Sequence, residues 1–348
     1  MENNTTENNT LNGKLHLQSN GNVILKNEGA IPTSNESSST NNSTIEQNHP
    51  DSDMKTWEEV SISVPWGLVC GKWWGPRNKQ PIIAIHGWQD NAGTFDRLIP
   101  LLTPKHPVLC IDLPGHGKSS KYPQGMHYYL FWDGISLIRR IVRKHQWKNV
   151  ILLGHSLGGA LAFMYAACFP NEVDKYISID IPGPSVRCLK KQAAITGHSI
   201  DKFLDYEELP ESKIPSYTYN EVIELVLHAY DGSVDKQGVE ILMKRGMNPV
   251  PQHLDREGYA FARDLRLKVS GLGMFSKEQV LSYAERIKCK VLNIRAEPGM
   301  KFDVYDEIID HIKTSAEVVI MHKVPGTHHI HLVNPERIYK FINEFLEM

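Results

Sequence analysis

The stretch "NVILLGHSLGGALAFMYAACFP", residues 149–170, decides the fold of this chain. Its apolar run Val150–Leu153 is typical of a buried strand, and the Ala-rich run that begins at Ala160 is typical of a buried helix. Between them lies the pattern G-x-S-x-G, with Ser156 two residues from each flanking glycine. That pattern predicts a sharp strand-to-helix turn that holds the serine hydroxyl at the carboxyl edge of a sheet. Neighbouring strand and helix crowd such a turn, which favours glycine on both sides.

Short apolar runs alternate with helical patterns on both sides of this stretch. We expect strands in "WEEVSISV", "GLVCGKWWG", "PIIAIHG", "PVLCIDLPG", "VDKYISIDI", "CKVLNIRAE" and "AEVVIMHKVPG". We expect helices in "FDRLIPLL", "YYLFWDGISLIRRIVRKH", "FDVYDEIIDHIK" and "NPERIYKFINEFLE". This alternation predicts an α/β fold whose mostly parallel sheet is covered by helices on both faces.

Three regions differ in composition. Residues 1–55 contain no aromatic residue, and 25 of these 55 positions are Asn, Ser or Thr, so we expect a disordered tail. Residues 56–181 and 287–348 carry the alternating pattern of the α/β core. Residues 182–286 interrupt it with helical pieces such as "YNEVIELVLHAY", and we expect a mainly helical cap inserted between the sixth and seventh strands.

Composition excludes several classes of function. The formal net charge of the 348-residue chain is −2, so no electrostatic footprint for nucleic acid is expected. The five scattered cysteines contain no C-x-x-C pair, and no secretory signal is visible, so we expect reduced thiols and a cytoplasmic location. No apolar run approaches the ~20 residues that span a bilayer, and the ending Phe345–Met348 is not the peroxisomal S-K-L signal. No phosphate loop or zinc signature is present, so no cofactor or metal is expected.

A nucleophilic serine requires a base that reaches it from the same sheet edge. The stretch "VPGTHHIHLVNPERI", after the last strand, offers His328, His329 and His331. His328 directly follows the turn that ends the strand and is therefore the predicted base. We expect His329 and His331 to be polar packing residues.

The reaction also requires two backbone N–H groups for the oxyanion. One is predicted at Leu157, directly after the serine. The other is predicted at Trp88 in the loop "HGWQDN", where Gly87 allows a close approach of the chain. The turn "DLPGHG", residues 112–117, is interpreted as structural.

The motifs "HGWQDNAGTFDRL", "IDLPGHGKSS", "GHSLGG" and "PGTHHIHLVNPE" together resemble those of the α/β-hydrolase fold superfamily. The run from "VPWGLVCGKWWG" to "YYLFWDGISLIRRIV" looks most like the serine hydrolase-like (kraken-like) proteins. The resemblance covers about residues 57–348. It implies an eight-stranded sheet with a cap, and it also implies that the base is the seventh residue before Pro335, which is His328.

The acid that orients this histidine is the open question of the sequence. Most relatives carry it after the seventh strand in a pattern like G-x-x-D, but this chain has Gly299 where that Asp would stand. Our first prediction is Asp180, which ends the sixth strand; haloalkane dehalogenases resemble this arrangement. Glu297 is the alternative, followed by Asp303 or Asp306.

Two functions follow from these motifs. The first is a serine hydrolase that cleaves a small to medium apolar ester through an acyl-enzyme, with Ser156, His328 and Asp180 as the catalytic residues. An apolar cap, with Met243, Met247 and Met274, favours an apolar substrate. The second is an inactive hydrolase fold that binds an apolar ligand or a partner. The sequence leaves the oligomeric state open.

Overall fold

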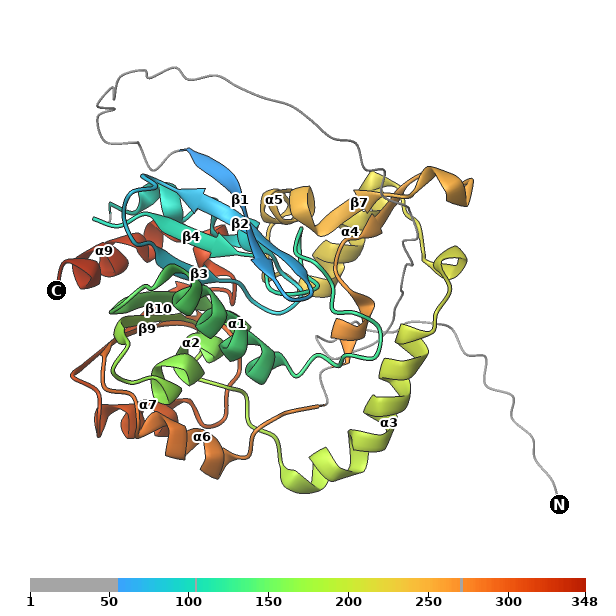
Figure 1. The fold of residues 1–348 in the computed structure, drawn as a ribbon. Coiled ribbons are helices and arrows are strands. Elements are labelled where there is room, and N and C mark those ends of the chain that lie inside the picture. The colour runs from blue at the N-terminus through green and yellow to red at the C-terminus, as the bar shows by residue number, and fades with distance from the viewer. Residues whose placement is uncertain (1–55, 104, 270–271) are drawn as a thin grey trace, which may run out of the picture.

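The structure is a computed structural model that describes residues 56–103, 105–269 and 272–348 (Figure 1). The predicted N-terminal tail, residues 1–55, lies outside the described residues.

One eight-stranded sheet forms the centre of the molecule. In spatial order its strands are β1, β2, β4, β3, β5, β6, β9 and β10. Their bounds are β1 Trp57–Val64, β2 Gly67–Trp74, β3 Ile82–Ile85, β4 Val108–Ile111, β5 Val150–His155, β6 Val173–Ile179, β9 Lys290–Pro298 and β10 Val318–Gly326. β2 pairs antiparallel with both β1 and β4, and all other neighbours in the sheet pair parallel. The predicted mostly parallel sheet is therefore confirmed, and β1 and β2 form an antiparallel hairpin at its N-terminal edge.

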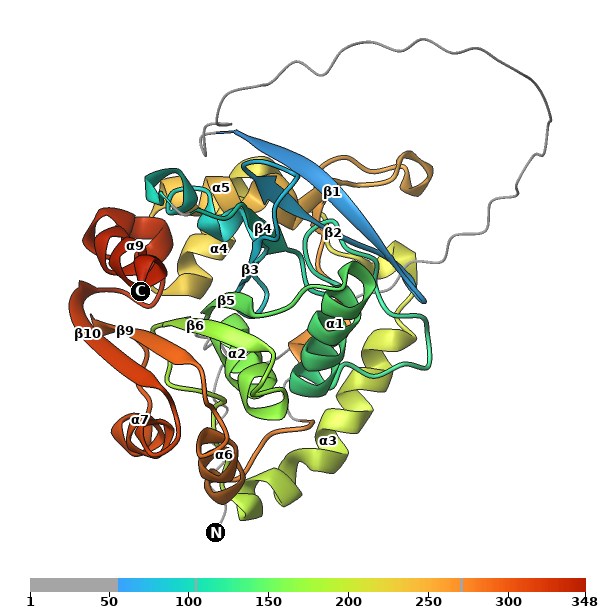
Figure 2. The same ribbon diagram turned by 60° about the vertical axis from the view of Figure 1, so that its left-hand side comes forward.

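Helices cover both faces of the sheet, as Figure 2 shows. One face carries α1 Leu130–His145, α2 Leu157–Cys168, α6 Lys277–Ala284 and α7 Tyr305–Lys313. The other carries η1 Ala92–Phe95, η2 Ile99–Leu101 and α9 Tyr339–Glu347. Alternate residues of one strand feed the two cores: in β3, Ile83 and Ile85 face the first, and Ile82 and Ala84 face the second.

One expected helix is different in the structure. The segment "FDRLIPLL" forms no continuous α-helix but parts of the short 3-10 helices η1 and η2. Pro100 lies at the start of η2, and its lack of an N–H removes the hydrogen bond that a longer helix would need there.

The segment between β6 and β9, where an insertion is predicted, is mainly helical up to η5. It contains α3 Leu189–Glu207, η3 Glu211–Lys213, α4 Tyr219–Tyr230, α5 Lys236–Gly246, β7 Met247–Pro249, η4 Gln252–Leu254, β8 Tyr259–Phe261 and η5 Leu265–Lys268. β7 and β8 form a small antiparallel hairpin, an element that the sequence did not predict. α4 and α5 share an apolar cluster with Leu332 of α8, Ile330–Val333, which precedes η6, Pro335–Arg337. α6 instead packs against α2 and α7 of the core, so the cap boundary at residue 286 remains a prediction.

Two buried arginines of the insertion lie where it meets the core, and each pairs with two carboxylates, which belong to the core for Arg245 and to the insertion itself for Arg266. The Arg245 guanidinium donates to Asp112 Oδ2 at 3.1 Å and to both oxygens of Glu59 at 2.8 Å. The Arg266 guanidinium donates to Asp264 Oδ2 at 2.8 Å and to Glu207 Oε1 at 3.1 Å. Arg266 also donates to the Pro123 carbonyl of the core at 3.1 Å. Each guanidinium is buried, yet each has two carboxylate partners.

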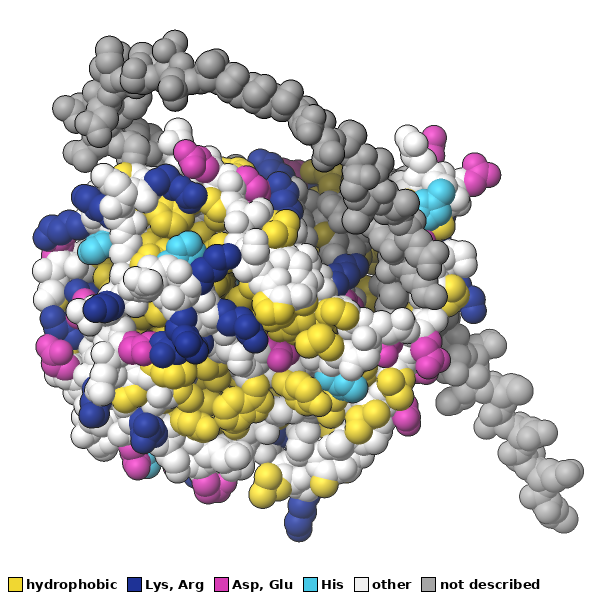
Figure 3. All heavy atoms as spheres, in the orientation of Figure 1, with side chains coloured by type: hydrophobic (Ala, Val, Ile, Leu, Met, Phe, Trp, Pro, Cys, Tyr) yellow, Lys and Arg dark blue, Asp and Glu magenta, His cyan; other side chains and the backbone are white. Residues whose placement is uncertain are grey.

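Charged side chains of both signs lie on the surface of the molecule. On the face drawn in Figure 3, Lys and Arg side chains are interspersed with Asp and Glu, and apolar patches lie between them. Within the described residues, every helix is too short or too polar to cross a membrane.

Candidate active site

Ser156 lies on a strained turn between β5 and α2. Its backbone has φ 51° and ψ −120°, a region that residues other than glycine rarely adopt. A Cβ on Gly158 would lie 1.9 Å from the Ile85 carbonyl oxygen, and one on Gly154 would lie 2.3 Å from the Gly158 backbone. Both flanking positions are thus closed to any side chain, which is the physical reason for the G-x-S-x-G pattern.

His328 lies at the same sheet edge as Ser156. Since β5 and β10 run in the same direction in one parallel block, both residues follow the carboxyl ends of their strands. The residue before the serine, His155, connects the two loops: its Nε2 lies 2.9 Å from the His328 carbonyl oxygen. A carbonyl only accepts, so His155 Nε2 donates and its Nδ1 carries a free lone pair. Sequence reasoning did not identify this link.

Asp180 lies beside His328. Its side chain is fully buried, and its Oδ2 is 2.6 Å from His328 Nδ1. The carboxylate also accepts the Ala296 N–H at 2.8 Å and the Met300 N–H at 2.7 Å. The ladder between β5 and β6 continues here, since the Ser156 N–H donates to the Ile179 carbonyl at 3.3 Å. A carboxylate on Nδ1 leaves Nε2 of His328 as the nitrogen able to accept a proton.

The alternative acids lie elsewhere. Glu297 is exposed, and its Oε1 lies 3.7 Å from Lys323 Nζ. Asp306 is exposed and pairs with Arg295 at 3.4 Å. Asp303 is also exposed. Among the described residues, Asp180 is the one carboxylate within hydrogen-bonding distance of His328.

Gly299 explains how the loop after β9 accommodates an acid from β6. A Cβ at this position would lie 2.5 Å from Asp180 Oδ1, and its φ of +44° favours glycine as well. Ala296 near the end of β9 and Met300 in the loop after it supply the N–H groups that hold the carboxylate. The glycine that stands in place of the family's usual Asp therefore leaves the room that Asp180 occupies.

The loop that contains Trp88 lies against the serine turn. A Cβ on Gly87 would lie 3.3 Å from the Ser156 Cβ, so the loop passes as close as a glycine allows. Leu157 is the first residue of α2, where N–H groups have no partner within the helix. In the described part of the chain, no backbone carbonyl accepts the N–H of Trp88 or of Leu157.

Two buried histidines hold this loop in place. His86 Nδ1 donates to the Gly87 carbonyl at 2.7 Å, and its Nε2 accepts the Leu113 N–H at 2.9 Å. His116 Nε2 accepts the Gln89 N–H at 3.2 Å. Burial lowers the pKa of His86 to about 4, and burial together with the nearby His86 lowers the pKa of His116 to about 3. Both rings are therefore neutral scaffolding at pH 7. The sequence suggested no such role, because each histidine stands alone in its own loop.

Asp90, His155 and His329 form a buried group behind the serine turn. Their candidate ligand atoms all lie within 4.8 Å of one another. Asp90 Oδ2 and His155 Nδ1 have no hydrogen-bond partner in the described structure, and burial raises the pKa of Asp90 to about 7. One carboxylate and two imidazoles are ligands that Zn²⁺ accepts, and a proton or an ordered water satisfies the same two acceptors. These are the described residues that could hold a metal.

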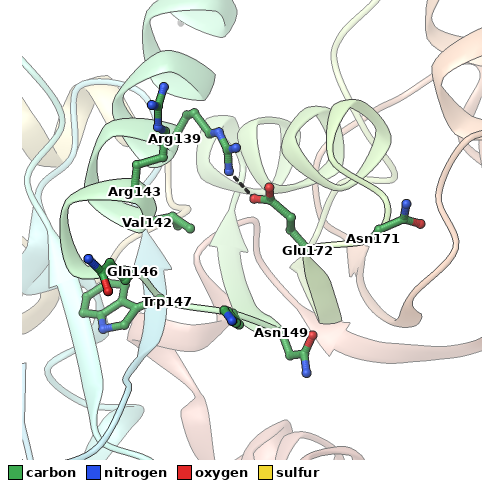
Figure 4. A pocket seen from close by; sticks show the side chains of 9 residues that line it. Arg139, Val142, Arg143, Gln146, Trp147, Asn149, Asn171 and Glu172 are labelled. Atoms are coloured by element: carbon green, nitrogen blue, oxygen red, sulfur yellow. Dashed lines mark hydrogen bonds and ion pairs between the residues drawn. The ribbon is translucent and has the colours of Figure 1, made fainter.

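A hollow of about 550 Å³ lies at the other end of β5 from Ser156 (Figure 4). It is lined by Arg139, Val142, Arg143, Gln146, Trp147, Lys148, Asn149, Asn171 and Glu172. Arg139 and Glu172 form an ion pair across it. It contains none of the predicted site residues.

Comparisons with known proteins agree with this fold. Residues 80–209 match the α/β hydrolase fold family. A probable serine hydrolase of Drosophila melanogaster is 62% identical over 295 residues, which are 84% of this chain and 88% of the relative. A serine hydrolase-like protein of Danio rerio is 32% identical, over 83% of this chain and 88% of the relative.

Among solved structures, a hypothetical protein of Pseudomonas aeruginosa PAO1 superimposes with a TM-score of 0.72 at 27% identity. The match covers 84% of this chain and 100% of that structure. The chain therefore belongs to the α/β-hydrolase fold family, as a hydrolase of the serine hydrolase-like group.

Proposed function

We propose that this protein hydrolyses carboxylic esters through an acyl-enzyme formed on Ser156. In the proposed reaction, Ser156 Oγ attacks the carbonyl carbon while His328 Nε2 takes the hydroxyl proton. The Trp88 and Leu157 N–H groups donate to the oxyanion. His328 then gives its proton to the departing alkoxide, and a water molecule, deprotonated by His328, releases the acyl group.

Asp180 is the proposed orienting acid. A carboxylate on Nδ1 fixes the tautomer whose Nε2 is basic, and it stabilises the imidazolium that forms during attack. The observation that carries the proposal is the 2.6 Å contact between Asp180 Oδ2 and His328 Nδ1. The strained turn at Ser156, at the same sheet edge, supports it.

The proposed substrate is a small to medium ester with an apolar body, because the insertion places apolar residues of α4 and α5 against Leu332 of the core. The proposal keeps the predicted cytoplasmic location, which rests on the cysteine pattern of the sequence. The alternative of an inactive binding protein was motivated by the missing acid after the seventh strand. Asp180 beside His328 supports the hydrolase instead. The labelling experiment distinguishes a hydrolase from an inactive binding protein.

The test is covalent labelling with a fluorophosphonate probe, followed by turnover of 4-nitrophenyl esters of graded acyl length. We expect the wild-type protein to be labelled and to hydrolyse at least one ester, and the Ser156→Ala protein to do neither. Circular dichroism of both proteins controls for folding. A folded wild-type protein that takes no label and cleaves no ester would be evidence for the inactive binding protein.

A further inference from the structure

Arg263 is a cation of the insertion that no carboxylate of the described structure neutralises. Its Nε is buried without a hydrogen-bond partner, and its Cζ lies 4.3 Å from the centroid of the Phe261 ring. Arg266, three residues later, has two carboxylate partners. Desolvating a guanidinium without a counter-charge is unfavourable, so a ligand that supplies the charge is the expected complement.

Backbone hydrogen bonds fix the chain on both sides of Arg263. The Ala262 N–H donates to the Gly246 carbonyl at 2.9 Å, and the Asp264 N–H donates to the Gly115 carbonyl at 2.7 Å. The residue after Gly115 is His116, which accepts the N–H of Gln89, next to Trp88. Two hydrogen bonds, Asp264 to Gly115 and Gln89 to His116, therefore connect the segment of Arg263 with the loop that contains Trp88.

The charge of Arg263 also affects the pKa values of two buried groups, His116 and Tyr230. It lowers the pKa of His116 on the oxyanion side and, against the larger effect of burial, that of Tyr230. The Tyr230 ring packs 4.8 Å from the ring of His329, the neighbour of His328. The hydrogen bond from the Asp264 N–H to the Gly115 carbonyl thus places Arg263 beside the segment that contacts the loop of Trp88.

Lys268 is a second basic residue of the insertion, five positions after Arg263. It is half-buried and has no ion-pair partner among the described residues. Burial, together with the charge of Arg263, lowers the pKa of Lys268 to about 7. A bound anion would favour the charged form of Lys268 and would offset the repulsion from the charge of Arg263.

We infer that Arg263 and Lys268 bind an anionic group of the substrate, a carboxylate or a phosphate, on the cap side of the active site. The planar guanidinium suits either group, because it can donate two parallel hydrogen bonds to both. The substrate is then an ester with an apolar body and one anionic group. This inference rests on the proposed ester hydrolysis and adds a substrate class to it.

The test compares esters that differ in charge but not in size. For an anion on the acyl side, the pair is 4-nitrophenyl 5-carboxypentanoate and its neutral amide, 4-nitrophenyl 5-carbamoylpentanoate. For an anion on the alcohol side, the pair is the pentanoate ester of 4-hydroxyphenylacetate and that of 4-hydroxyphenylacetamide. We expect wild-type kcat/KM to favour the anionic member of one pair by about tenfold or more, the effect of one charged hydrogen-bonded contact.

Arg263→Gln should abolish this preference, because kcat/KM for the anionic ester should fall about tenfold more than kcat/KM for the neutral ester. Arg263→Lys should keep part of it, because the charge remains. The matched control is Arg256→Gln, which changes another half-buried arginine of the insertion, one that donates to the Glu211 carbonyl; it should keep the full preference. The inference is wrong if neither pair shows a preference in the wild type, or if Arg263→Gln slows both members of a pair equally.

Calorimetry on the Ser156→Ala protein separates this inference from the proposed function. Adipate and inorganic phosphate serve as probes that need no turnover. We expect at least one of them to bind and to lose affinity about tenfold in a Ser156→Ala, Arg263→Gln protein. If the wild type cleaves no ester but the probes bind through Arg263, the hydrolysis proposal fails and the anion site stands. If neither probe binds and no charge preference is seen, the anion site fails.

Discussion

Two regions of this molecule differ in whether their buried polar groups have partners: charged groups at the edges of the insertion are paired, and several polar groups near Ser156 are not. At the margins, the buried guanidinium groups of Arg245 and Arg266 each bind two carboxylates. Behind the serine turn, Asp90 Oδ2 and His155 Nδ1 are buried with no partner in the described structure, and so is Arg263 Nε in the insertion. An unsatisfied buried polar group costs about 1–3 kcal/mol.

This difference separates polar groups that stabilise the fold, because they have partners, from polar groups that a ligand could satisfy. The pairs that Arg245 forms with Glu59 and Asp112 join the insertion to the core, and those of Arg266 stabilise the insertion itself. A group left incomplete at a strained turn is destabilising, and such groups concentrate at functional sites. Removing a partner should therefore lower stability in the first group and catalysis in the second.

The largest effect is expected from the acid at the centre. Asp180→Asn should lower kcat for ester hydrolysis by about 10⁴-fold, because the amide no longer holds His328 in the tautomer with a basic Nε2. Steady-state kinetics with a 4-nitrophenyl ester measures this. The matched control is Glu297→Gln, which changes an exposed carboxylate and should leave kcat within about twofold. If Glu297→Gln is the damaging variant, Asp180 is not the orienting acid.

At the edge of the insertion, removing Arg245 should mainly lower the free energy of unfolding. Arg245→Met leaves the fully buried Asp112 carboxylate without its cation, and we expect the free energy of unfolding to fall by about 3–5 kcal/mol. Denaturant titration measures it. Lys277→Ala breaks an exposed pair with Glu307 and should cost less than about 1 kcal/mol. Equal effects of the two variants would contradict the view that the buried pair holds the cap.

Gly299 tests whether the room around Asp180 matters. In Gly299→Ala, the new methyl group would lie 2.5 Å from Asp180 Oδ1, so the carboxylate must move away from His328. We expect kcat to fall by about 10- to 100-fold, the cost of a misplaced catalytic group. The control is Gly197→Ala in α3, where a Cβ meets open space and activity should not change. Wild-type kcat in Gly299→Ala would show that Asp180 does not depend on this gap.

The smallest effect concerns the neutral histidines of the scaffold. His86 and His116 have pKa values of about 4 and about 3, below the ordinary value of about 6.5 in the unfolded chain. Between these values the unfolded state binds more protons, so stability falls as pH falls from about 6.5 toward 4. Each such histidine contributes about 1.4 kcal/mol per pH unit.

Unfolding free energies at pH 7, 6 and 5 test this. His116→Gln should flatten the dependence by about 1.4 kcal/mol per pH unit, whereas His253→Gln, at an exposed position, should leave it unchanged. Identical pH slopes for the wild type and His116→Gln would contradict the neutral scaffold.

Much of the fold could be predicted from the sequence because its signals are local. The apolar runs on either side of Ser156 predict a strand and a helix, and the two glycines predict the turn between them. The segment "FDRLIPLL" was predicted wrongly, since its apolar pattern suits a helix but Pro100 limits it to short 3-10 turns.

The sequence by itself determined the α/β architecture, the strained serine turn and the histidine loop after the last strand, because each depends on residues within about a dozen positions of one another. The tertiary structure alone decided which carboxylate lies beside His328. Asp180 and the loop that holds it are more than a hundred positions apart, and they meet only because β6 and β9 are neighbours in the sheet. The same reason applies to Arg263: whether a buried charge has a partner depends on packing between distant segments, which no local pattern encodes.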